Sequence, residues 1–76
     1  MSKDTLKKHS VKLWGHPTSI TIEDIFWDSL KDIAQKKNIP LKKLIEHIDE
    51  TREGNLSSAL RVHVCQYYQD LAKSCR

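Results

Sequence analysis

The sequence lacks long hydrophobic runs. Its longest stretch of consecutive apolar residues is three residues, from Ile25 to Trp27, whereas a membrane-spanning helix needs about 20. No apolar segment of the kind found in secretory signals follows Met1. Glycine and proline are also scarce, with two of each among 76 residues, which excludes collagen-like and linker-like chains. We therefore expect a soluble, cytoplasmic protein with an ordered fold.

Cysteine is equally scarce, and neither a disulfide nor a metal site is expected. Cys65 and Cys75 are the two cysteines, and a bridge between them would close only a short loop near the C-terminus. Metal sites need three or four ligands at recurrent spacings. The four histidines are instead scattered along the chain, at His9, His16, His47 and His63. We expect no metal and no other cofactor.

The patterns that enzymes use are missing as well. The sequence has no glycine-rich phosphate loop and no paired-carboxylate site. Ser57 and Ser58 are adjacent hydroxyls, but no general base or oxyanion site accompanies them, as a nucleophile would require. Following Asn55, they are typical of the first turn of a helix. We therefore expect a protein that is not an enzyme.

The chain contains a modest number of hydrophobic residues from which to build a core. Hydrophobic residues make up 38% of the sequence and charged residues 30%, which is the composition of a globular domain. Below about 80 residues, however, a core usually needs a disulfide, a metal or a partner subunit. Because the first two are not expected, we expect a homodimer.

Positive charge gathers at the N-terminus. The net charge is +3, and residues 1–16 contain four lysines, among them Lys8 and Lys12, against Asp4 alone. We interpret residues 1–9 as a basic arm that precedes a single domain over residues 10–76. Such an arm suits contact with phosphates. A frayed, solvated N-terminus is the alternative explanation.

Hydrophobic periodicity predicts two short strands followed by three helices. Apolar and polar residues alternate over 10–14 and 18–22, with a turn signal between these segments, as in half-buried strands. Apolar residues then recur at steps of three and four, which predicts helices over 24–37, 40–50 and 56–73. The order is therefore ribbon, helix, helix, helix.

Single residues support these helix bounds. Asn38 is expected to follow the first helix in a left-handed conformation, and Asn55 to cap the third. Three aromatic residues near or within the helices, Trp27, Tyr67 and Tyr68, are interpreted as core, core-rim or interface packing.

The segment from Thr18 to Ile48 resembles the ribbon-helix-helix family of DNA-binding proteins, which includes the Arc and MetJ repressors. The strand end Ile20-Thr21-Ile22, the amphipathic helix after it and the Asn38-Ile39-Pro40 turn before the next helix follow the family pattern. The strings Thr18–Glu23 with Phe26-Trp27 and Asn55–Arg61 are more specific. They are similar to those of short bacterial members that carry an extra C-terminal helix.

The resemblance implies a mainly α fold with a short β-strand, assembled as an intertwined homodimer. Each chain would give the strand over 18–22 to a two-stranded antiparallel ribbon between subunits. This arrangement supplies the partner that the short core requires, and such dimers often have no stable monomer. The expected dimer core is Ile20, Ile22, Phe26, Leu30, Leu44, Ile45 and Ile48.

The resemblance further implies a transcription regulator that inserts this ribbon into the major groove of double-stranded DNA. Side chains of a strand alternate between its two faces. With the isoleucines facing inward, the expected DNA base-reading residues are Pro17, Ser19 and Thr21. The expected phosphate contacts are Lys8, Lys12, Lys42 and Lys43, the last two at the N-terminus of the second helix.

Departures from the family pattern leave a second hypothesis open. Serine and threonine read bases less strongly than Arg, Asn or Gln, and both positions also suit ordinary solvent-facing residues. Pro40 lacks an N–H donor at the expected phosphate site, so Lys42 and Lys43 also suit a solvated turn. The alternative function is a protein-interaction module, antitoxin-like or an adaptor, which keeps the fold for dimerisation and offers its third helix to a second protein.

Overall fold

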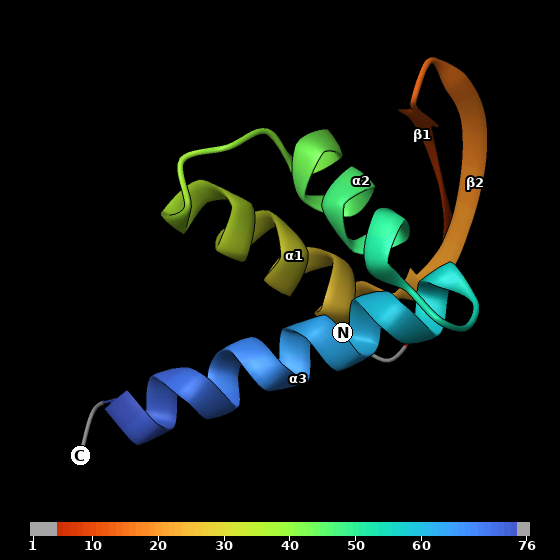
Figure 1. The fold of residues 1–76 in the computed structure, drawn as a ribbon. Helices are drawn as coiled ribbons and strands as arrows, with labels where there is room; N and C mark the ends of the chain where they lie inside the picture. The colour runs from red at the N-terminus through yellow and green to blue at the C-terminus, as the bar shows by residue number, and fades with distance from the viewer. Residues whose placement is uncertain (1–4, 75–76) are drawn as a thin grey trace.

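The protein, described over residues 5–74 by a computed structural model, consists of a β-hairpin followed by three helices (Figure 1). The elements are β1 (Leu6–Leu13), β2 (His16–Glu23), α1 (Asp24–Lys36), α2 (Leu41–Thr51) and α3 (Leu56–Ser74). The three predicted helices agree with these bounds to within one residue at each end. The ribbon-helix-helix fold class is therefore confirmed, with a third helix at its C-terminal end.

The two strands pair with each other as an antiparallel sheet. Leu13 lies opposite His16 beside the turn, and Leu6 lies opposite Glu23 at the open end. This ribbon lies within one chain, whereas the ribbon that we expected pairs the strand over 18–22 with the same strand of a second chain, so that intersubunit pairing stays a prediction. Residues 6–9, which we expected in a basic arm, belong to β1, while residues 1–4 of that arm lie outside the described residues.

Residues 6–9 carry no strand pattern because their inward positions are polar. Lys7 and His9 share the inner face of the hairpin with their register partners, Ile22 and Ile20. The Lys7 ammonium lies 3.3 Å from the Asp24 carboxylate. The His9 ring stacks on Trp27, with ring centroids 3.9 Å apart and planes at 8°. Both contacts are with α1, so no pattern within residues 6–9 predicts them.

A two-residue turn joins the strands. Trp14 has φ 55° and Gly15 has φ 82°, and both are left-handed, as a type I′ hairpin turn requires. Glycine adopts this conformation freely, whereas a bulky residue such as Trp14 is strained by it. The Trp14 N–H donates to Glu46 Oε2 at 2.8 Å, and its indole N–H donates to Asp49 Oδ2 at 3.2 Å. The tip of the hairpin is therefore held on α2.

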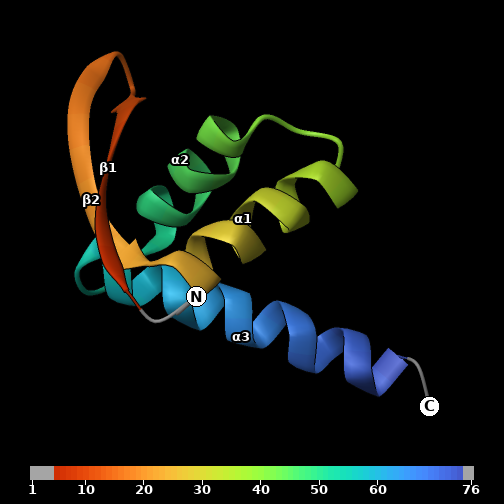
Figure 2. The same cartoon turned by 180° about the vertical axis from the view of Figure 1, so that it is seen from behind.

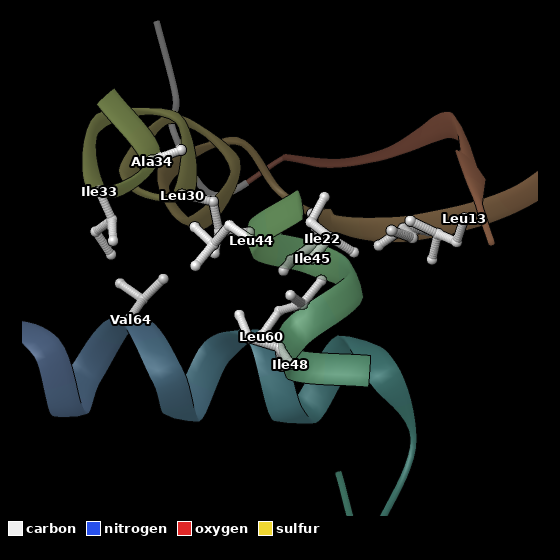
Figure 3. Close-up of a cluster of buried hydrophobic side chains, with 11 residues drawn as sticks. Leu13, Ile22, Leu30, Ile33, Ala34, Leu44, Ile45, Ile48, Leu60 and Val64 are labelled. Atoms are coloured by element: carbon white, nitrogen blue, oxygen red, sulfur yellow. The ribbon is translucent and has the colours of Figure 1, made fainter. Parts of the chain in front are cut away.

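The hydrophobic core lies between the inner face of the hairpin and the three helices (Figure 3). Every element contributes to it, and its buried members are Leu13, Ile20, Ile22, Leu30, Ile33, Ala34, Leu44, Ile45, Ile48, Leu60 and Val64. Six of the seven residues expected in a dimer core are thus buried within a single chain. The seventh, Phe26, is partly buried and packs against the others.

The third helix covers the core from the side of α1 and α2 (Figures 1 and 2). Its buried residues, Leu60 and Val64, lie in its first half, whereas residues 68–73 are exposed and the C-terminal end of the helix projects beyond α1 and α2. Asn55 caps α3 as predicted, because its Oδ1 accepts the Ser58 N–H at 2.8 Å. Asn38 adopts the expected left-handed conformation after α1, with φ 60°. No helix in residues 5–74 is long and apolar enough to cross a membrane.

Placing a carboxylate at Ile22 is expected to unfold the chain. Ile22 is 0% exposed. Burying an ionised group there without a partner costs a large part of the free energy of unfolding, which is about 5–15 kcal/mol for a small domain. Circular dichroism of Ile22→Asp should show loss of helix, whereas Thr21→Asp, next to it on the outward side, should stay helical. Full helicity in Ile22→Asp would mean that the two faces of β2 are assigned the wrong way round.

Candidate nucleic-acid interface

The hairpin register separates an inner face on the core from an outer face in solvent. Residues directly opposite each other in an antiparallel pair share a face. Three outward pairs follow the turn: Lys12 with Pro17, Ser10 with Ser19 and Lys8 with Thr21. All six side chains are exposed. We call these six residues the outer ribbon face.

The outer ribbon face brings together most of the residues that sequence analysis selected for DNA contact. The three expected base-reading residues lie in a row along β2 and alternate with inward-facing residues, as expected. Lys8 and Lys12 lie beside them on β1, directly opposite Thr21 and Pro17. Ser10 is an addition that sequence analysis missed, because its position becomes evident only from the pairing of β1 with β2.

The outer ribbon face carries two positive charges, from Lys8 and Lys12. Lys8 and Lys12 form no ion pair with any residue in the described part of the chain. The acidic residue at the open end of the hairpin, Glu23, accepts a hydrogen bond from Arg61 Nε at 2.8 Å. That hydrogen bond is the main reason why the pKa of Glu23 lies below its usual range. The charge of Glu23 is therefore already matched by Arg61.

The chemistry of the outer ribbon face suits a nucleic-acid groove. The major groove of B-DNA admits a two-stranded β-ribbon. Ser10, Ser19 and Thr21 present small hydroxyls that both donate and accept hydrogen bonds, and the methyl group of Thr21 fits against a thymine methyl. Lysine side chains on the neighbouring strand are long enough to reach phosphates as point charges.

The other two expected lysines lie on α2, apart from the outer ribbon face. Lys42 and Lys43 are exposed in the first turn of that helix, which packs on the inner side of the hairpin (Figure 2). Lys43 Nζ lies 3.8 Å from Glu46 Oε1, and the Lys43 N–H donates to the Pro40 carbonyl at 3.0 Å. With Pro40 as its N-cap and no side-chain cap, this terminus offers few free donors to a phosphate.

The aromatic residues have packing roles, in agreement with the sequence analysis. Trp27 and Tyr67 are partly buried against the core, and Trp27 stacks on His9. Tyr68 is exposed, and its hydroxyl donates to Asp32 Oδ2 at 3.1 Å. These side chains belong to α1 and α3, so none of them forms a stacking surface on the outer ribbon face.

A groove lies between the C-terminal end of α2 and α3. It has a volume of about 460 Å³ and is lined by Ile48, Val62 and His63, among others. Burial, together with the nearby Lys37, lowers the pKa of His63, and its Nε2 has no hydrogen-bond partner within residues 5–74. No cluster of three metal-ligating side chains occurs in those residues. The groove therefore combines apolar side chains such as Val62 with charged ones such as Arg52 and Glu53.

Comparisons with known proteins agree with this architecture. A family model for a ribbon-helix-helix domain matches residues 6–68. The structure also resembles that of an uncharacterized protein from Bordetella pertussis Tohama I, with a TM-score of 0.79 and 28% sequence identity. The match covers 95% of this chain and 62% of that chain, so this chain spans less than two thirds of the length of that relative. No curated protein matches the sequence.

Replacing Glu46 tests whether its carboxylate holds the hairpin tip, and with it the outer ribbon face, on α2. Glu46 is 4% exposed and accepts the Trp14 N–H. Glu46→Ala should lower the free energy of unfolding by about 1–3 kcal/mol, because the Trp14 donor loses its acceptor, and should speed hydrogen exchange of the Trp14 amide. Glu50→Ala, at an exposed position of the same helix, is the matched control. Equal exchange rates in the two variants would contradict the anchoring role.

Proposed function

The chain belongs to the ribbon-helix-helix family, and we propose that it is a homodimeric DNA-binding transcription regulator. Members of this family typically bind DNA. In the proposal, the β-ribbon enters the major groove of double-stranded DNA, as β-ribbon readers do. The observation that carries the proposal is the outer ribbon face, where a row of small side chains on β2 lies beside two lysines on β1.

The two strands of the hairpin would contact different parts of the DNA. In the proposed dimer, β2 of each copy pairs with β2 of the other, which gives the strand order β1-β2-β2-β1. Neighbouring strands lie about 4.8 Å apart, so the two β1 strands would be about 14 Å apart, close to the major-groove width of about 12 Å. The central strands would then lie over the base edges, and the outer strands along the phosphates.

Residue roles follow from this arrangement. Pro17, Ser19 and Thr21 of each copy would face the bases, while Lys8 and Lys12 would contact phosphates on either side of the groove. The lysine pair on α2 would add phosphate contacts outside the groove, with less help from the backbone than a free helix N-terminus gives. Small hydroxyls discriminate weakly among bases, so we propose moderate sequence preference on top of a strong, salt-dependent attraction.

A second candidate function is favoured by the surface of α3. Val62 is 65% exposed beside the groove between α2 and α3, and Leu71 is 37% exposed on the projecting half of the helix. Such apolar side chains suit contact with another protein. In this alternative, the chain is an interaction module, antitoxin-like or an adaptor, that keeps the fold for dimerisation and presents α3 to a partner protein.

Two sets of substitutions separate base reading from charge. Ser19→Ala combined with Thr21→Ala should weaken binding to the preferred site by roughly 1–3 kcal/mol per lost base contact, while binding to random duplexes should barely change. Lys8→Gln combined with Lys12→Gln should weaken binding to all duplexes alike and flatten the salt dependence, because each phosphate contact releases counterions. The preferred site is first selected from random duplex DNA, and titrations over a range of salt then measure both effects.

Circular dichroism checks that each variant is folded, and Lys31→Gln, on the exposed side of α1, controls for the loss of a positive charge elsewhere. If the wild-type protein binds no duplex more tightly than about 100 μM at low salt, which is weaker than ordinary non-specific binding, the regulator proposal is wrong. The interaction-module hypothesis would then take its place.

A further inference from the structure

The free edge of β2 has a defined set of outward backbone groups. In a hairpin with a two-residue turn, the residues flanking the turn exchange hydrogen bonds, and bonded and non-bonded pairs then alternate. Leu13 and His16 flank the turn. Pro17, Ser19 and Thr21 therefore direct their backbone groups away from β1. The Asp24 N–H, which donates to the Thr5 carbonyl at 3.1 Å, continues the same alternation beyond the open end.

One of these outward groups is already occupied. The Ser57 hydroxyl donates to the Thr21 carbonyl at 2.9 Å. Ser57 lies in the first turn of α3, and two neighbouring contacts fix that turn in place. Asn55 caps the helix through the Ser58 N–H, and Arg61 reaches Glu23 at the end of β2. The hydroxyl is therefore held against the strand edge by the fold around it.

The other end of the same edge lacks one hydrogen-bond donor. Pro17 has a carbonyl to offer but no N–H. An antiparallel pairing of two β2 strands that is centred on Ser19 places Pro17 of each copy opposite Thr21 of the other. In such a pair, the Thr21 N–H can donate to the Pro17 carbonyl, but the Thr21 carbonyl receives nothing in return. An unsatisfied buried carbonyl is costly, and this carbonyl is the one that Ser57 already satisfies.

We infer that Ser57 supplies in cis the hydrogen bond that Pro17 of a second copy cannot give, and so sets the register of the dimer with Ser19 on its two-fold axis. Registers centred on Ile20 or Thr21 would bring a strand N–H to the Thr21 carbonyl as a second donor, beside the Ser57 hydroxyl. Registers centred nearer the turn would shorten the pairing. The occupant of the edge is therefore a second copy of this chain, in one register. This inference rests on the homodimer part of the proposed function.

The register also determines what would meet the centre of the DNA site. With Ser19 on the axis, the two Ser19 side chains lie side by side on the outward surface. Thr21 of one copy then lies beside Pro17 of the other, on either side of the centre. Ser57 itself touches no DNA in this arrangement. It acts through the Thr21 backbone, as a positioning residue for the strand that faces the bases.

Cysteine cross-linking tests the register directly. In a Cys65→Ser, Cys75→Ser background, Ser19→Cys should form a disulfide-linked dimer under mild oxidation. Opposed residues in a hydrogen-bonded pair have Cα atoms about 5.5 Å apart, which lies within the disulfide range of about 4.4–6.8 Å. A register centred on Ile20 would instead place residue 19 opposite residue 21. A mixture of the Ser19→Cys and Thr21→Cys chains would then cross-link better than Ser19→Cys alone, and the inference would be wrong.

A double-mutant cycle tests the role of Ser57. Ser57→Ala should weaken dimerisation at least about 10-fold, because strand pairing would then bury two Thr21 carbonyls without a donor, one in each copy. Ser57→Thr keeps the hydroxyl and should stay within about 3-fold of wild type. In a Pro17→Ala background the new Ala N–H can donate to the Thr21 carbonyl, so Ser57→Ala should there cost less than about 3-fold. Sedimentation equilibrium measures each dissociation constant, and circular dichroism measures folding.

Each outcome decides between distinct possibilities. Loss on Ser57→Ala with rescue by Pro17→Ala supports the inference. Equal loss in both backgrounds means that Ser57 serves only the packing of α3, and no loss means that the hydroxyl is dispensable; either result overturns it. A wild-type chain that stays folded and monomeric at hundreds of micromolar overturns the homodimer proposal itself. A dimer with the wrong cross-links leaves that proposal standing and overturns the register alone.

Discussion

The left-handed turn at Trp14 and Gly15 determines the direction of every other residue in the hairpin. Because side chains alternate along a strand, a slip of one residue in the pairing would exchange the inner and outer faces. The turn prevents this slip by requiring Leu13 to face His16. Ile20 and Ile22 then complete the core, and the outer ribbon face lies in solvent. The strained Trp14 is held by two carboxylates of α2, so the same contacts that fix the turn also fix the angle of the ribbon on the helices.

The core of this chain is closed without a second copy. A partner subunit was expected to complete it, because a core of fewer than about 80 residues usually needs a disulfide, a metal or a partner. The structure supplies the missing cover from within the chain, through β1 on one side and through Leu60 and Val64 of α3 on the other. In the proposed dimer, assembly would then depend on a short, polar strand edge. Folding and assembly would be separable, and a single hydroxyl such as that of Ser57 would influence assembly while leaving folding nearly unchanged.

The parts of the fold that periodicity encodes were predictable, and the parts that depend on distant contacts were not. The helices follow from apolar residues at steps of three and four, and the outward direction of Thr21 follows from the isoleucines on either side of it. The first half of β1 did not follow from any local pattern, because its inward residues, Lys7 and His9, are stabilised by Asp24 and Trp27 of α1. Ser10 and Ser57 were missed for the same reason, since each gains its position from a strand or helix far along the sequence.

The composition of the outer ribbon face constrains how the proposed regulator can select its site. Lysines bind phosphates of any sequence, and serine or threonine hydroxyls accept several base edges, so neither group alone separates one site from another by much. The remaining source of selectivity is the geometry of the dimer. If two rigid hairpins are fixed about one axis, their side chains reach the groove at set intervals, and DNA whose groove width and symmetry match those intervals is favoured without strong single contacts. Selectivity would then depend on the precision of the dimer register more than on the identity of any one base-facing residue. A proline without an N–H at the strand edge, together with a hydroxyl that replaces its hydrogen bond, would therefore be useful in a protein whose base-facing side chains discriminate weakly.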